Sequence, residues 1–189
     1  MCIRDSCVDN VFRLWQEGAG EKLTQLIFCD LSTPGKGFNI YDDIKKKLAD
    51  RGVPESEIAF IHDANTDEKK KALFSRVRSG NVRVLLGSTA KMGAGTNVQD
   101  RLVALHDLDA PWRPGDLEQR KGRIARQGNM NETVHVYRYV TEQTFEMCIR
   151  DSSRTVRAPL GAHGSPFTFV LRFNRSMNFR SEEHTSALQ

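Results

Sequence analysis

The fold class of this chain is indicated most clearly by residues 82–109, VRVLLGSTAKMGAGTNVQDRLVALHDLD. Its two apolar runs, 82–87 and 102–109, have the length and the Val/Leu content of strands in a sheet. The segment between them, 88–99, is rich in glycine and hydroxyl side chains. Ligands bind at the carboxyl ends of strands in open parallel sheets, so this loop is the first place to look for a site.

Outward from this stretch, strands alternate with helices. Three more strands are predicted, at 26–29, 58–62 and 133–140. Apolar residues at helical spacing predict helices at 8–17, 41–52 and 68–80, and an arginine-rich helix at 116–128. This alternation predicts an α/β fold, with a parallel sheet and helices on both of its faces.

The composition is typical of a soluble globular protein, with 39% hydrophobic and 28% charged residues among 189. No apolar run approaches a membrane span, and the first residues lack the apolar core of a signal peptide. The four cysteines do not pair as Cys-x-x-Cys and have no histidine at metal-ligand spacing. We therefore expect a reducing compartment, no membrane association and no metal site.

The net charge of +4 does not by itself indicate nucleic-acid binding, because it is unevenly distributed. Residues 7–146 carry 21 basic and 20 acidic side chains, whereas residues 147–189 carry 6 arginines and 3 acids. Most of the excess lies in the tail. Evidence for nucleic-acid binding must therefore come from particular residues and not from the net charge.

The hexapeptide MCIRDS occurs twice, at 1–6 and 147–152. A structural repeat would recur as a whole supersecondary unit, which this is not. Both copies resemble the translation of a sequencing-library transposon end, and 180–189 resembles a translated sequencing adapter. We expect 1–6 to be an artefactual start, 7–146 the informative protein, and 147–189 an artefactual or disordered tail that packs poorly. Within that tail, only SPFTFVLRF (165–173) has the composition of a strand.

Two glycine-rich stretches fail the tests for nucleotide motifs. No segment matches the P-loop pattern Gly-x₄-Gly-Lys-Ser/Thr, and GKG at 35–37 is a turn. GAGTNV at 93–98 begins like a dinucleotide fingerprint, but Val98 occupies the third glycine position. Gly93 and Gly95 still allow close approach of a ligand to the backbone. Ser88 and Thr89 suit either a phosphate contact or a helix cap.

The segment DLEQRKGRIARQG (116–128) concentrates positive charge. Arg123 and Arg126 are three residues apart, so a helix would place them on one face. Two guanidinium groups aimed the same way suit a phosphate chain. The alternative is an ordinary solvated basic helix.

Taken together, these segments resemble a known family. LIFCD (26–30), the 88–99 loop and HDLDAPWRPGDLEQRKGRIARQGN (106–129) resemble motifs IV, V and VI in the second RecA-like lobe of a superfamily 2 helicase. The Swi/Snf-type branch is the most similar, through Trp112, Pro114, Gln119, Arg123, Arg126, Gln127 and Gly128. More narrowly, 60–70, 87–109 and 136–146 resemble the large helicase–methylase proteins of phages and mobile elements.

The resemblance implies a RecA-like, P-loop-NTPase-type sheet without its own P-loop, together with residue roles. Arg123 and Arg126 would be arginine fingers toward ATP bound on the first lobe. Residues implied on the nucleotide side are Gln119, Gly93, Gly95 and Asn97. Residues implied to contact the DNA backbone are Ser32, Thr33, Ser88, Thr89 and Lys91, with Asp30 beside them. Local capping or ion pairing is the alternative for each of these side chains.

In this family the phosphate cradle and the acidic residues for Mg²⁺ and catalysis belong to the first lobe. We therefore expect half of an ATPase, inactive alone, from a bacterial or phage-encoded cytoplasmic helicase or translocase. Its implied cofactor is ATP with Mg²⁺, and its implied partners are DNA, the first lobe and a fused or associated DNA methylase. Two other functions stay open: a non-catalytic nucleic-acid-binding module, and a Rossmann-like metabolic enzyme, against which Val98 counts.

Overall fold

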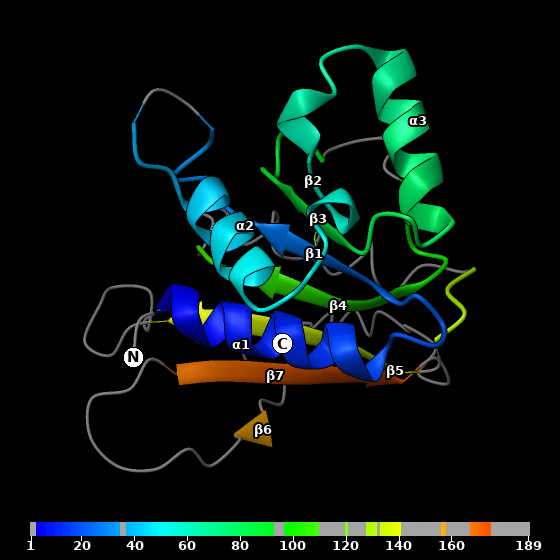
Figure 1. Ribbon diagram of the computed structural model, residues 1–189. Coiled ribbons are helices and arrows are strands. Elements are labelled where there is room, and N and C mark those ends of the chain that lie inside the picture. Colours follow the sequence, from blue (N-terminus) through cyan, green and yellow to red (C-terminus); the bar gives the residue numbers. More distant parts are fainter. Residues whose placement is uncertain are drawn as a thin grey trace, which may run out of the picture.

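A computed structural model of the chain describes residues 3–34, 37–92, 97–109, 120, 128–131, 133–140, 156–157 and 167–174 (Figure 1). The helices are α1 (Ile3–Glu17), α2 (Ile40–Asp50) and α3 (Asp67–Arg78), with short 3₁₀ helices η1 (Glu55–Glu57) and η2 (Ile61–Asp63). The strands are β1 (Thr24–Phe28), β2 (Ile58–Phe60), β3 (Val84–Gly87), β4 (Leu102–Asp107), β5 (Thr133–Val140), β6 (Val156–Arg157) and β7 (Phe167–Asn174).

The predicted parallel sheet is confirmed. All seven described strands join one sheet in the order β2-β3-β1-β4-β5-β7-β6. Every neighbouring pair among β2, β3, β1, β4 and β5 is parallel. These five are the strands expected from the apolar runs. The expected strand at 58–62 ends earlier, at Phe60, because η2 turns the chain from Ile61 onward.

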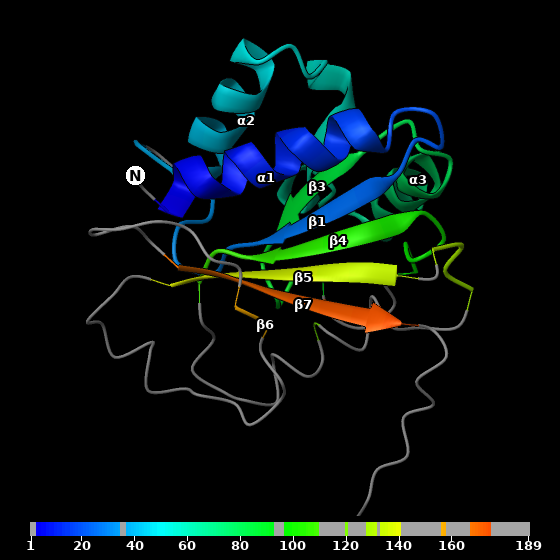
Figure 2. The same cartoon turned by 90° about the horizontal axis from the view of Figure 1, so that it is seen from below.

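Helices cover both faces of the sheet, as predicted. Alternate residues of β1 and the residue that follows it belong to two separate apolar clusters, because successive strand side chains point to opposite faces. Ile27 and Cys29 pack in the cluster that contains the buried residues of α1 and α2. Leu26 and Phe28 pack in the cluster with Leu73 of α3. Figure 2 shows α1 and α2 together on one side of the strands.

Local capping explains where α2 and α3 begin. The Asn39 side chain accepts a hydrogen bond from the backbone N–H of Asp42 at the start of α2. Thr66 does the same for α3. Gly52, just beyond α2, has φ of +97°, a left-handed conformation that glycine adopts without strain. Helix α1 begins at Ile3 rather than at residue 8, inside the first MCIRDS copy.

A buried polar network ties β1, β4, β5 and α1 together. The Gln25 amide donates to the carbonyl of Val11 (3.0 Å), so its Oε1 is left facing Nε2 of His106 (3.0 Å). Nε2 of His106 must therefore carry the proton, and Nδ1 accepts from the Tyr139 hydroxyl (2.8 Å). Asn10 Nδ2 donates to the same hydroxyl (3.3 Å). This arrangement fixes His106 as a neutral imidazole.

One piece of the tail differs from expectation. We predicted that 147–189 packs poorly, yet all eight residues of β7 pair antiparallel with β5 (Figure 2). The segment FTFVLRFN contains three Phe residues, which favour strands, and β5 would otherwise present an unpaired edge. The strand-like composition noted for SPFTFVLRF (165–173) agrees with β7, which spans Phe167–Asn174. Among the described residues, no helix has the length and apolar character needed to cross a bilayer.

Candidate functional site at the carboxyl ends of the strands

The register of the sheet brings three strand ends to one level. Phe28 of β1 lies opposite Gly87 of β3 on one side and Asp107 of β4 on the other. The residues two positions further on are Asp30, Thr89 and Asp109. Parallel strands end at the same edge of a sheet, so these three side chains gather there. Hydrogen bonds join them directly.

Asp30 is the first link between these loops. Its Oδ1 accepts from the backbone N–H of Thr89 (2.6 Å), and its Oδ2 accepts from the Thr89 hydroxyl (2.7 Å). Asp109 Oδ2 accepts from the backbone N–H groups of Asp30 and Leu31, the latter at 2.9 Å. The loops after β1, β3 and β4 are thereby joined at their first residues.

Arg120 occupies the centre of this arrangement and is 0% exposed. Its Nη1 donates to Asp107 Oδ1 (2.8 Å), and its Nη2 donates to Asp30 Oδ2 (2.7 Å). Both Nε (2.8 Å) and Nη2 (2.6 Å) lie within hydrogen-bond distance of the Thr89 hydroxyl. The carbonyl and carboxylate of Asp109 are at 3.3 and 3.4 Å. The guanidinium also stacks over the ring of Phe28, 4.8 Å from its centroid.

The Arg120 cluster, consisting of Arg120, Asp30, Thr89, Asp107 and Asp109, combines three carboxylates with one central guanidinium. Burial would lower the pKa of Arg120, but the carboxylates raise it, with Asp107 acting most strongly. Burial raises the pKa of Asp107, and the charge of Arg120 opposes that rise. Without the guanidinium, buried negative charges would face one another. The guanidinium of Arg120 therefore compensates the negative charge of the buried carboxylates Asp107 and Asp109.

The turn after β3 depends on a close approach at Gly87. A Cβ there would lie 2.6 Å from Ile61 Cγ2 and 2.7 Å from Met92 Cγ. The turn is held further by Ser88, whose hydroxyl accepts from the backbone N–H of Lys91 (3.3 Å). Glycine at this position lets the 88–92 loop pack directly against η2.

The structure places the sequence-predicted residues in different settings. Thr89 lies in the Arg120 cluster, and Ser88 is buried and caps its own turn. The Ser32 hydroxyl accepts from the backbone N–H of Ile40 (3.1 Å) at the start of α2. The exposed members of the set are Thr33, Lys91 and Asn97. Their contacts with DNA or nucleotide stay predictions, as do those of Ser32, Ser88 and Thr89.

Several predicted residues lie outside the described part of the chain. These are the two arginines of Arg-x-x-Arg and the glycines and glutamine assigned to the nucleotide side: Arg123, Arg126, Gln119, Gly93 and Gly95. The residue that the analysis of the sequence missed is Arg120. In the sequence, Arg120 stands out only as part of a basic stretch. Asp107 and Asp109 stand out only as part of a predicted strand. The available signal was the presence of acidic residues at the ends of two predicted strands, which call for a buried cation.

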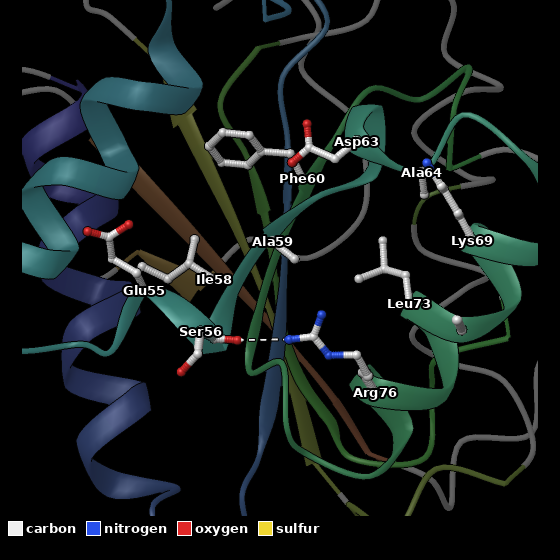
Figure 3. A pocket seen from close by; sticks show the side chains of 11 residues that line it. Glu55, Ser56, Ile58, Ala59, Phe60, Asp63, Ala64, Lys69, Leu73 and Arg76 are labelled. Carbon is white, nitrogen blue, oxygen red and sulfur yellow. Dashed lines mark hydrogen bonds between the residues drawn. The ribbon is translucent and has the colours of Figure 1, made fainter.

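A groove of about 410 Å³ lies elsewhere, along the edge strand β2 and α3 (Figure 3). Arg76 of α3 reaches across it, donating from Nη2 to the carbonyl of Ser56 (3.2 Å). Its charged lining mixes Glu55 and Asp63 with Lys69 and Arg76. This balance of signs does not favour an anion such as a nucleotide. No group of three potential metal ligands occurs among the described residues.

Three comparisons with known proteins agree on the fold. The chain is 37% identical to the uncharacterized ATP-dependent helicase YqhH of Bacillus subtilis (strain 168) over 79 residues, which are 41% of this chain and 13% of that protein. The C-terminal part of the Fun30 ATPase domain is similar with a TM-score of 0.56 and 18% identity, covering 75% of this chain and 42% of that one. The Hef helicase domain of Pyrococcus furiosus is similar with a TM-score of 0.52 and 16% identity, covering 80% and 28%.

The chain thus spans only a small part of its curated relative and less than half of each structural neighbour. The match to a family model is more extensive, because it covers residues 9–128 and so takes in β1 to β4, most of α1, all of α2 and α3, and the Arg120 cluster. On this match, the chain belongs to the helicase conserved C-terminal domain family.

Proposed function

We propose that this domain is the second motor lobe of an ATP-dependent DNA helicase or translocase, and that Arg123 and Arg126 are its arginine fingers. One observation carries the proposal. The loops after β1, β3 and β4 converge on Arg120, only three residues before Arg123. Arg120, which belongs to the arginine-rich segment, therefore lies at the carboxyl edge of the sheet, where ligands of parallel sheets bind.

ATP would be shared between two lobes in this proposal. A first RecA-like lobe would hold the phosphates and Mg²⁺, since this chain has no P-loop and its carboxylates Asp30, Asp107 and Asp109 are committed to Arg120. The arginines of this lobe would stabilise the charge that develops on the transferred phosphoryl group. Gln119, Gly93, Gly95 and Asn97 would line the nucleotide side.

DNA would lie along the loops that follow β1 and β3. Thr33 and Lys91 are exposed on these loops and suit contacts with phosphate oxygens. Such contacts carry little sequence information, as expected of a motor that moves along any DNA. A methylase fused to or associated with the same parent, from a phage or mobile element, and a cytoplasmic location are further parts of the proposal.

The natural domain would span residues 7–146, with translated adapter sequence at 1–6 and 147–189. The duplicated MCIRDS supports this division. Raw sequencing reads across the codons for residues 146–153 test it. Continuous genomic coverage through this junction would contradict an artefactual origin of the tail.

The test of the proposed function uses the longer protein with both lobes. We expect Arg126→Ala to abolish DNA-stimulated ATP hydrolysis and leave DNA affinity nearly unchanged. Arg51→Ala is the matched control, because Arg51 is the exposed C-cap residue of α2 and pairs with Asp9. Loss of DNA affinity in step with the ATPase rate would make Arg126 a DNA contact. If the 189-residue chain alone also bound DNA with a steep salt dependence, the two results together would favour a non-catalytic nucleic-acid-binding module.

A further inference from the structure

We infer that Arg120 is a positioning residue: it anchors the arginine-rich segment to the ends of β1, β3 and β4 and so sets where Arg123 and Arg126 lie. This inference rests on the proposed function. It assigns to Arg120 a role that is distinct from contact with nucleotide or DNA. The reasons are the burial of Arg120, the number and origin of its partners, and its distance along the chain from the two fingers.

Burial separates Arg120 from any ligand. Its side chain is fully enclosed, and each of its three nitrogens lies within hydrogen-bond distance of a protein acceptor. Because its nitrogens already face protein acceptors, this guanidinium is not available to bind a phosphate. It differs in this from Lys91, which is exposed at the same edge of the sheet.

The partners of Arg120 make it a rigid anchor. Acceptors come from three separate strand ends: Asp30 after β1, Thr89 after β3, and Asp107 at the end of β4. A planar fork held in three directions, with its face against Phe28, has both position and orientation fixed. A lysine could keep the charge but could not satisfy these acceptors from one plane.

Arg123 and Arg126 are close to Arg120 along the chain, so the anchor has to fix their positions over only a short distance. Consecutive residues advance by at most about 3.6 Å, so Arg123 lies within about 11 Å of Arg120 and Arg126 within about 22 Å. Catalytic groups lose on the order of 100-fold in rate when they are misplaced by about 1 Å. A small shift at the anchor is therefore sufficient to disable the fingers without any change in ligand contacts.

The test is a double-mutant cycle in the protein with both lobes. We expect Arg120→Lys to lower kcat for DNA-stimulated ATP hydrolysis on the order of 100-fold, with KM for ATP and DNA affinity little changed. In an Arg126→Ala background, Arg120→Lys should cause no further loss. Arg83→Lys is the matched control, because Arg83 is also buried, at 4% exposure, and stacks on Trp15. It should leave kcat unchanged.

Several outcomes would overturn the inference. They are an unchanged kcat in Arg120→Lys, a change confined to KM or DNA affinity, an equal loss in Arg83→Lys, or losses that multiply in the cycle. If Arg120→Lys does not fold, Asp107→Asn decides by the same criteria, since the amide keeps the size of the side chain but removes the charge that pairs with Arg120.

A second measurement separates this inference from the proposed function. If Arg126→Ala leaves the ATPase rate unchanged, the proposed function fails, but anchoring can still be measured by amide hydrogen exchange on the 189-residue chain. We expect Arg120→Lys to accelerate exchange within 116–128 and leave α3 unaffected. Unchanged exchange within 116–128 would refute the anchoring itself.

Discussion

Buried His106 makes the stability of this domain sensitive to acid. Burial, together with the nearby charges of Arg13 and His135, lowers the pKa of His106 to about 3. In the unfolded chain the same imidazole has a pKa of about 6.5. Below about pH 6.5 the unfolded state therefore binds a proton that the folded state refuses. Stability is fully present above this pH and falls as the pH decreases toward 3.

The size of the effect follows from the two pKa values. At pH 5 the unfolded state gains about 2 kcal/mol from protonation of this one histidine, while the folded state gains almost nothing. That is a substantial share of the 5–15 kcal/mol that typically stabilises a domain. It corresponds to a change of about 30-fold in the ratio of folded to unfolded protein.

The assay is urea unfolding followed by far-ultraviolet circular dichroism between pH 5 and pH 8. His106→Gln is the comparison, because it cannot titrate and its amide can still bond Gln25 or Tyr139. The free energy of unfolding of the wild type relative to the variant should fall by about 2 kcal/mol from pH 8 to pH 5. Other titrating groups cancel in this difference. Parallel curves for the two proteins would refute the reasoning.

Three further predictions concern the fold and the isolated chain. Gly87→Ala should lower the free energy of unfolding by about 1–3 kcal/mol in thermal denaturation, because its Cβ would overlap Ile61 and Met92. Gly20→Ala, whose Cβ would meet nothing within 4 Å, should leave it nearly unchanged. Tyr139→Phe should cost about 1–3 kcal/mol in urea unfolding by leaving Nδ1 of His106 unsatisfied. Tyr137→Phe should cost less, since Arg13 can still pair with Glu17. The purified 189-residue chain should show no DNA-stimulated ATP turnover, and measurable turnover would contradict its assignment as half of a motor.

The fold was predictable from the sequence because local patterns and tertiary structure agree. The apolar runs became the buried strands, and the helices expected at 41–52 and 68–80 are α2 and α3. The boundaries that differ have local causes. Strand β2 stops at Phe60 because η2 begins at Ile61, and β7 pairs with the edge that β5 would otherwise leave open.

The centre of the site was not predictable, because its partners come from distant parts of the chain. Asp30, Thr89 and Arg120 are joined by the parallel register of β1, β3 and β4, which no local pattern specifies. In the sequence, Arg120 is one of several basic residues in a row. Its burial distinguishes it, and burial is a property of the fold.

The most direct test of the central claim measures transition-state recognition in the protein with both lobes. Arginine fingers act on charge that develops during phosphoryl transfer, so they should matter more for ADP with aluminium fluoride than for a non-hydrolysable ATP analogue. We predict that Arg126→Ala weakens binding of the aluminium fluoride complex on the order of 100-fold and leaves binding of the ATP analogue nearly unchanged. Equal weakening of both ligands, or of neither, would contradict the claim that this lobe supplies the fingers.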